Sequence, residues 1–125
     1  MKPTLIITKN LLFITILVFT SCYKEGVGGK SSVSGYVQHH SLKISNAVVY
    51  IKYGATEFPG FDVSAYDAST TCDANAYFEI KDLRKGDYYL YSKGYDNSIM
   101  SEVTGGIGIK LKYNKSITTN VPVTE

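Results

Sequence analysis

The sequence predicts an all-β fold, an antiparallel sandwich of about seven strands that follows an N-terminal signal segment. No stretch after Ser31 keeps the apolar period of a helix, whereas alternating apolar and polar residues recur along the chain. The alternating stretches are short and rich in β-branched and aromatic residues. Turn residues separate them at close intervals, among them Ser45-Asn46, Lys85-Gly86-Asp87 and Asn114-Lys115. This spacing of strands and turns is typical of a sandwich.

The strands follow from the alternation, taken in chain order. We expect them at residues 33–38, 47–53, 77–81, 88–93, 107–113 and 117–123, with a weaker strand at 62–66. Because successive side chains of a strand point to opposite faces, the alternation also selects the core. The residues expected to point inward are Ala47, Val49, Ile51, Phe78, Ile80, Leu83, Tyr88, Leu90, Ile107, Ile109, Leu111, Val121 and Val123.

Residues 1–21 differ in composition from the rest of the 125-residue chain. Lys2 and Lys9 precede an uncharged apolar run over residues 11–19, and small residues follow it up to Cys22. This order is typical of a secretory signal, and the run is shorter than the ~20 apolar residues that a membrane-spanning helix needs. We therefore expect a signal peptide at 1–21.

The formal net charge of the mature chain is zero. Removal of residues 1–21 takes two lysines, which leaves 13 − 2 = 11 basic residues against 11 acidic ones. The sequence shows no concentrated run of basic residues, which a nucleic-acid partner would require. Nucleic-acid binding is therefore not expected.

The stretch Val18-Phe19-Thr20-Ser21-Cys22 resembles the lipobox of bacterial lipoproteins, with Phe19 where Leu or Val is commoner. The resemblance implies that Cys22 is acylated and becomes the first residue of the mature chain. It also implies that the acyl chains anchor the protein in the outer membrane of the cell envelope. Several acyl chains on one terminus anchor a protein firmly in a membrane, whereas a single acyl chain anchors it only marginally. Gly and Ser residues then predict a flexible tether over 22–32. Lys24-Glu25 resembles the export signal of Bacteroidota surface lipoproteins, although a solvated linker explains this pair equally well.

Two pairs of segments carry a second resemblance, which covers nearly all of residues 31–125. Residues 34–37 and 44–51 resemble the first two strands of the carboxypeptidase regulatory-like modules. Residues 71–78 and 83–90 resemble the later pattern of this family, Thr-x-Asp-x-x-Gly-x-Phe followed by Leu-x-x-Gly-x-Tyr. The resemblance implies a seven-stranded, transthyretin-like (prealbumin-like) Greek-key sandwich over 33–125, in a family whose modules are mostly accessory. Ala76 stands where the family has a turn glycine, so we expect the left-handed turn position to move to Asn75.

Surface tyrosines are the candidate ligand-contact residues. Alternation places Tyr50, Tyr89 and Tyr91 on outward faces of neighbouring or facing strands. Tyrosine combines apolar area with a hydroxyl, which suits contact with a glycan or a protein. The same residues are also ordinary strand-forming surface residues.

No catalytic, cofactor or metal site is predicted. His39 and His40 are neighbours that would point to opposite faces, and we expect both to be exposed at a turn. Cys72 is the only thiol left once Cys22 is acylated, and we interpret it as a semi-buried structural residue.

Two further motifs resemble binding loops. Asp73-x-Asn75-x-Tyr77-x-Glu79 lacks the central glycine of a calcium loop, and a surface calcium site that uses Asp62 or Asp67 stays open. The glycines at 105, 106 and 108 lack the third position of a dinucleotide fingerprint.

Two functional hypotheses remain. The first is a membrane-anchored lipoprotein whose non-catalytic accessory sandwich contacts another envelope protein or an extracellular polymer, for example by strand addition at an exposed edge. The second is a carbohydrate-binding module that uses the surface tyrosines.

Overall fold

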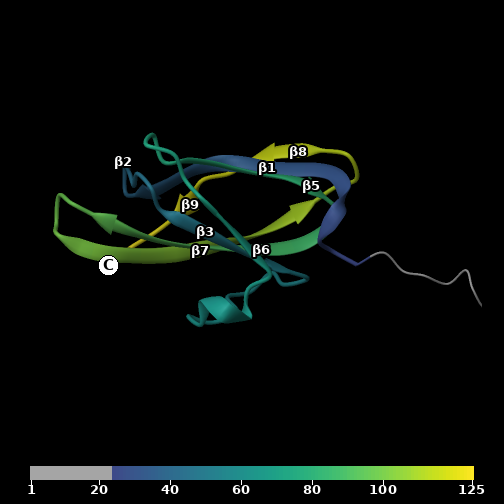
Figure 1. Ribbon diagram of the computed structural model, residues 1–125, viewed down its shortest axis with the longest axis horizontal. Helices are drawn as coiled ribbons and strands as arrows, with labels where there is room; N and C mark the ends of the chain where they lie inside the picture. The colour runs from purple at the N-terminus through teal and green to yellow at the C-terminus, as the bar shows by residue number, and fades with distance from the viewer. Residues whose placement is uncertain (1–23) are drawn as a thin grey trace, which may run out of the picture.

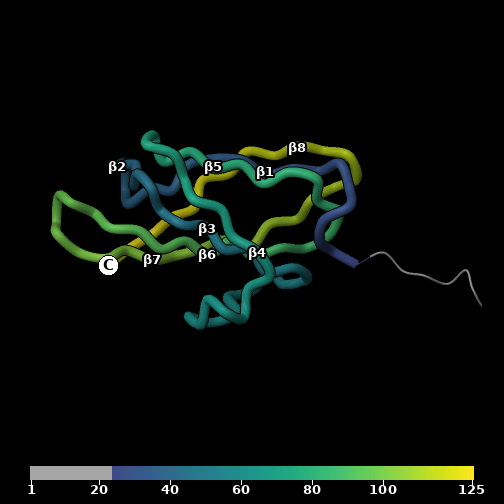
Figure 2. The backbone as a smooth tube through the Cα atoms, viewed as in Figure 1, coloured from purple at the N-terminus to yellow at the C-terminus, as the bar shows by residue number. Residues whose placement is uncertain are grey.

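A computed structural model describes residues 24–125, which form a sandwich of two β-sheets (Figures 1 and 2). One sheet is built around β1 (Val27–His39), which pairs in antiparallel fashion with β2 (Leu42–Lys43) and β5 (Tyr77–Leu83). The short strands β8 (Ser116–Thr118) and β9 (Val121–Pro122) pair with β1 in parallel.

The second sheet is antiparallel throughout and has the order β4-β3-β6-β7. Its strands are β4 (Ala68–Thr71), β3 (Val48–Tyr53), β6 (Gly86–Asp96) and β7 (Ser101–Leu111).

The all-β sandwich expected from the sequence is therefore confirmed, with differences in detail. The described residues form nine strands instead of seven, and the last two run parallel to β1. The single strand expected at 117–123 is divided into β8 and β9.

The core predicted by alternation lies between the two sheets. Val49, Ile51 and Leu90 are fully buried, and so is Tyr88. Ile80 and Ile107 are half-buried at its margin. The remaining predicted core residues are buried as expected, namely Ala47, Phe78, Leu83, Ile109, Leu111, Val121 and Val123.

The N-terminal segment is bound to the sandwich, which corrects the tether expected over residues 22–32. Strand β1 begins at Val27, so residues 27–32 lie in the sheet. The buried hydroxyl of Tyr88 accepts a hydrogen bond from the Gly26 amide (2.8 Å) and donates one to the Arg84 carbonyl (2.6 Å). The Arg84 amide in turn donates to the Gly26 carbonyl (2.8 Å). Composition alone suggested flexibility, but these long-range hydrogen bonds fix the segment.

The prediction of a weak strand at 62–66 is wrong. This segment contains a 3-10 turn, η2 (Val63–Ala65), and the strand β4 begins only at Ala68. The Asp62 carboxylate accepts hydrogen bonds from both the amide and the hydroxyl of Ser64, which is the local bonding that favours a turn. Strand β4 is a polar edge strand and lacks the apolar alternation that would have revealed it.

The left-handed turn position lies at Ala76 (φ 65°), not at Asn75 as expected. Asp73 causes this, because its carboxylate accepts from the amides of Asn75 and Tyr77 while its carbonyl accepts from the Ala76 amide. The left-handed conformation costs a non-glycine residue about 1–2 kcal/mol, which these three hydrogen bonds offset.

Candidate functional site

Strand register places the three candidate tyrosines on the outer face of the second sheet. Tyr50 of β3 lies directly opposite Tyr91 of β6, and Lys52 lies opposite Tyr89. The neighbours Val49, Ile51 and Leu90 point into the core, so alternation turns all three tyrosines outward. The predicted orientation of these side chains on neighbouring strands therefore agrees with the structure.

The long connection between β3 and β4, residues 54–67, folds over this outer face and protrudes below the sheet in Figure 1. Several hydrogen bonds fix its course. The Tyr66 hydroxyl donates to the Gly60 carbonyl (2.8 Å), and the Asp67 carboxylate accepts from the Tyr53 amide (2.7 Å). Lys52 reaches across and donates to the Ala65 carbonyl (3.0 Å).

This loop adds three aromatic rings to the sheet tyrosines. Tyr66 stacks on Tyr91 with ring centroids 5.5 Å apart and planes inclined by 23°. Phe58 lies 5.5 Å from Tyr91 and 6.0 Å from Tyr89, and Phe61 contacts Phe58 edge-on at 4.9 Å. We call the resulting cluster the aromatic patch, and its members are Tyr50, Phe58, Phe61, Tyr66, Tyr89 and Tyr91.

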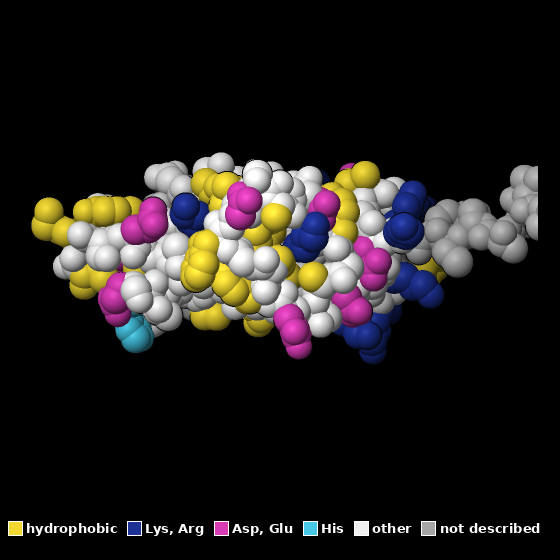
Figure 3. Space-filling view, turned by 90° about the horizontal axis from the view of Figure 1, so that it is seen from below, with side chains coloured by type: hydrophobic (Ala, Val, Ile, Leu, Met, Phe, Trp, Pro, Cys, Tyr) yellow, Lys and Arg dark blue, Asp and Glu magenta, His cyan; other side chains and the backbone are white. Residues whose placement is uncertain are grey.

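Tyr91 is not a surface residue, contrary to the expectation from sequence. Its exposed fraction is 2 %, because the rings of Phe58, Phe61 and Tyr66 cover it. Tyr50 and Tyr89 are half-buried beside it. The rings that face solvent belong to the loop, since Phe61 is 72 % exposed and Phe58 is 43 % exposed. Figure 3 views this face of the molecule and shows apolar side chains gathered at its centre.

The hydroxyls of Tyr66 and Tyr89 stay protonated over the physiological pH range. Burial, followed by the nearby Tyr91 and Tyr89, raises the pKa of Tyr66 to about 12. Burial also raises the pKa of Tyr89. At Tyr66 and Tyr89 the patch therefore offers neutral hydroxyls beside its aromatic rings.

Two glycines of β7 make room on this face, Gly108 for the loop and Gly106 for the Tyr89 ring. A Cβ atom at Gly108 would collide with the Thr56 carbonyl, and one at Gly106 would collide with the Tyr89 ring. Gly106 and Gly108 thus make room for the aromatic patch and for the loop that carries part of it. This explains a motif that resembles a nucleotide-binding loop only in composition.

Phe58 and Phe61 were not identified from the sequence. A signal was present, because the two phenylalanines flank Pro59-Gly60 in a stretch without strand alternation. Large apolar residues that flank a turn have no inward face to occupy and are therefore candidates for a binding surface.

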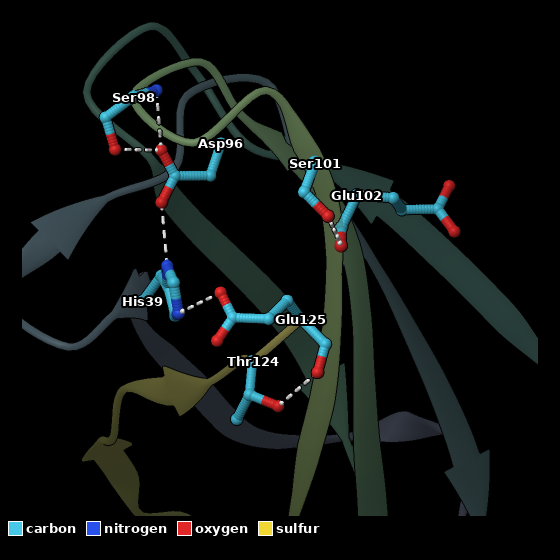
Figure 4. A network of polar contacts seen from close by, with 7 residues as sticks. All are labelled: His39, Asp96, Ser98, Ser101, Glu102, Thr124 and Glu125. Carbon is cyan, nitrogen blue, oxygen red and sulfur yellow. Dashed lines mark hydrogen bonds and ion pairs between the residues drawn. The ribbon is translucent and has the colours of Figure 1, made fainter.

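A second cluster lies at the opposite end of β1 from the N-terminal segment, around His39 (Figure 4). The His39 ring is buried, with Nδ1 2.7 Å from the Asp96 carboxylate and Nε2 3.6 Å from the Glu125 carboxylate. The other oxygen of Asp96 accepts from the amide and hydroxyl of Ser98. These Ser98 bonds, followed by His39, lower the pKa of Asp96 to about 2.

This cluster corrects the expectation that both histidines are exposed. His40 is exposed, but His39 is buried because it joins the end of β1 to the turn after β6 and to the C-terminal residues. The Ser98 hydroxyl donates to the Asp96 carboxylate and not to the His39 imidazole. A serine nucleophile activated by a histidine base would be hydrogen-bonded to that histidine, so this cluster does not have that arrangement.

The remaining candidate residues have local structural partners. Cys72 is buried, and burial followed by the Asp73 charge raises the pKa of its thiol to about 11, which opposes thiolate formation. The carboxylates of Asp62 and Asp67 accept the loop hydrogen bonds described above. Within residues 24–125, no group of three His, Cys, Asp or Glu side chains could hold a metal ion.

Cys22, the predicted acylation site, lies outside the described residues. In the part of the chain that the structure describes, no helix has the length and apolarity needed to cross a membrane. The sequence matches no protein-family model and no curated protein.

Proposed function

We propose that this chain is an envelope lipoprotein, acylated at Cys22 and anchored in the outer membrane. In this proposal its carboxypeptidase regulatory-like sandwich is not catalytic and binds another envelope protein through the aromatic patch. The exposure of Phe58 and Phe61 on a hydrogen-bonded loop is the observation that carries the binding function. Monomeric domains rarely leave such aromatic groups in solvent, and aromatic side chains are enriched at the centres of protein interfaces.

The arrangement of the exposed rings favours a protein over a glycan. Phe58 and Phe61 meet at an interplanar angle of 74°, so they form a wedge and not a flat platform. Tyr66 and Tyr91 stack nearly in parallel. This pair is not an open platform for a sugar, because Phe58 and Phe61 of the loop also contact Tyr91 and cover it. A wedge of apolar rings fits a pocket in a partner protein.

A carbohydrate-binding module is the second candidate, and one observation favours it. The half-buried Tyr50 and Tyr89 lie beside Lys52 of β3 and beside the loop that carries Asp62 and Ser64. A sugar needs such hydrogen-bonding groups beside an aromatic ring. In this case glycan binding would fall in Tyr50→Ala and Tyr89→Ala and would persist in Phe61→Ser.

Affinity purification of the intact acylated protein from solubilised envelopes tests the first candidate. We expect one co-purifying protein whose affinity falls about thirtyfold in Phe61→Ser, the size of effect found for residues central to an interface. Met100→Ser is the matched control, because Met100 is also highly exposed but lies in the turn between β6 and β7. Equal capture by Phe61→Ser and the unmodified chain would contradict binding through the aromatic patch and would favour addition to an edge strand.

Acylation has its own test. Cells that express the protein should incorporate labelled palmitate into it, and Cys22→Ser should abolish the label. Incorporation that is unchanged in Cys22→Ser, or absent from the unmodified protein, would contradict the anchor.

A further inference from the structure

Basic side chains gather at one end of the sandwich. Three segments meet there, residues 24–32, 81–87 and 110–116, and we call their surface the basic end. Strand pairing joins them, since Val27 lies opposite Leu83 and Gly86 lies opposite Leu111. The hydroxyl of Ser31 also donates to the carbonyl of Lys112 (2.6 Å).

The charge of the described chain is divided unevenly between this end and the remainder. The basic end holds eight Lys and Arg residues and three acidic residues, so its formal charge is 8 − 3 = +5. The other described residues hold three Lys and eight acidic residues, or 3 − 8 = −5. Figure 3 shows several dark blue side chains grouped at the end of the molecule next to the grey residues, while most of the magenta side chains are spread over the rest of this face. The neutral total conceals this asymmetry.

The position of the anchor would bring this end to a membrane. This step rests on the proposed acylation of Cys22, which is two residues from Lys24, the first residue described. The four peptide units from Cys22 to Gly26 span at most about 14 Å. The chain is fixed to the sandwich from Gly26 onward, so an acyl group at Cys22 would hold the basic end close to the lipid headgroups.

The surface of the basic end suits a lipid–water interface. Tyr113 and Val27 are both largely exposed there, and tyrosine is enriched at the headgroup level of membranes. A recess of about 330 Å³ opens between the three segments, and Lys30, Lys85 and Tyr113 are among its lining residues. Lysines placed around such a recess can contact headgroup phosphates while their stems cover apolar surface.

We propose that the basic end docks on anionic phospholipid headgroups. Docking of this kind would add an electrostatic contact to the acyl anchor and give the sandwich a fixed orientation. The aromatic patch lies on the outer face of the second sheet and would then remain free to meet a partner. Attraction between lysines and an anionic surface is screened within about a Debye length, so the contact depends on salt.

Vesicle sedimentation tests this proposal without the acyl chains. The protein is the mature chain, residues 22–125, with Cys22→Ser, which contains the whole sandwich. We expect binding to vesicles of equal parts phosphatidylcholine and phosphatidylglycerol, weak binding to phosphatidylcholine alone, and release at high salt. Because the assay does not use the lipid anchor, its result is independent of the palmitate-labelling result.

A matched pair of triple variants locates the contact. Lys85→Gln, Lys112→Gln and Lys115→Gln together should weaken binding about a hundredfold, since each lysine near an anionic surface contributes about fivefold. The control combines Lys43→Gln, Lys93→Gln and Ser41→Asp, which changes the net charge equally but lies outside the basic end and the aromatic patch. It should bind about as well as the parent chain, and circular dichroism should show both variants folded.

Several outcomes would overturn the proposal. These are equal loss of binding in the two triple variants, unchanged binding in the first one, and binding that does not depend on phosphatidylglycerol. Stronger binding to a soluble acidic polysaccharide than to the anionic vesicles would indicate a polymer partner in place of a membrane.

Discussion

Single aspartates decide the local structure at two places in the sandwich. At the end of β1, His39 is buried against Asp96, and in the turn before β5, Ala76 takes the left-handed position. In each case an aspartate decides the outcome, Asp96 by accepting from the imidazole and Asp73 by accepting from three amides. Asp96 lies 57 residues from His39 along the chain, so a local pattern cannot reveal it, whereas Asp73 lies three residues before Ala76.

The Asp96 carboxylate predicts a loss of stability in acid. Its pKa is about 2 in the folded protein, below the ordinary value of 3.8, so ionised Asp96 stabilises the fold above pH 4. This contribution is lost as the pH falls from about 4 to about 2. In Asp96→Asn, urea denaturation should show a clear destabilisation at pH 6 and a much smaller difference from the unmodified protein at pH 2.

Asp62→Asn is a suitable control for this pH dependence. The pKa of Asp62 is also lowered, chiefly by Ser64, but its carboxylate is exposed and bonds only within its own turn. Its substitution should change the profile less. Parallel pH profiles for Asp96→Asn and the unmodified protein would show that the His39–Asp96 pair does not contribute.

At the scale of elements, alternation predicted the strands that have one buried face. It located β3, β5 and β6 and the apolar half of β7. It did not find β4, whose residues are polar, or the early part of β1, which is rich in glycine and serine. These segments are strands because a neighbour supplies their hydrogen bonds, and a single sequence does not show that neighbour.

The candidate site was predicted only in part for a related reason. Alternation correctly placed Tyr50, Tyr89 and Tyr91 on the outer face, because orientation within a strand is a local property. The cover provided by Phe58 and Phe61 depends on how a fourteen-residue connection, 54–67, folds back over the sheet. No periodic pattern encodes that path.

The attachment of the N-terminal segment depends on the Tyr88 hydroxyl. Tyr88→Phe keeps the buried ring but leaves the Gly26 amide and the Arg84 carbonyl without this partner. We expect a destabilisation of about 1–3 kcal/mol in urea denaturation, with faster hydrogen exchange at Gly26. Tyr95→Phe on the same strand removes an exposed hydroxyl and should stay within about 0.5 kcal/mol. Unchanged exchange at Gly26 in Tyr88→Phe would contradict the fixed segment.

The position of the 54–67 loop depends on Gly108. Gly108→Ala introduces a Cβ atom against the Thr56 carbonyl, so the loop must move away from the sheet. The expected cost is about 1–3 kcal/mol, with faster proteolysis within the loop. Thr104→Ala, four residues earlier on the same strand, is the control and should leave the cleavage rate unchanged. A loop equally resistant in both variants would mean that Gly108 does not position it.

At the scale of the whole molecule, the sandwich has two distinct candidate surfaces for contact. One is the basic end, where the chain approaches Cys22, and the other is the aromatic patch on the outer face of the second sheet. Neither surface is evident in the sequence, because the cations are spread over three distant segments and the rings come from two strands and a loop. The formal charge of zero hides a separation of +5 and −5.

Site-specific photo-crosslinking in living cells tests directly whether the basic end contacts lipid while the aromatic patch contacts a partner protein. A photoreactive amino acid is placed in turn at position 61 in the aromatic patch and at position 112 in the basic end. We expect position 61 to form a discrete adduct with one envelope protein and position 112 to label lipid. Lipid adducts at position 61 together with protein adducts at position 112 would contradict the account.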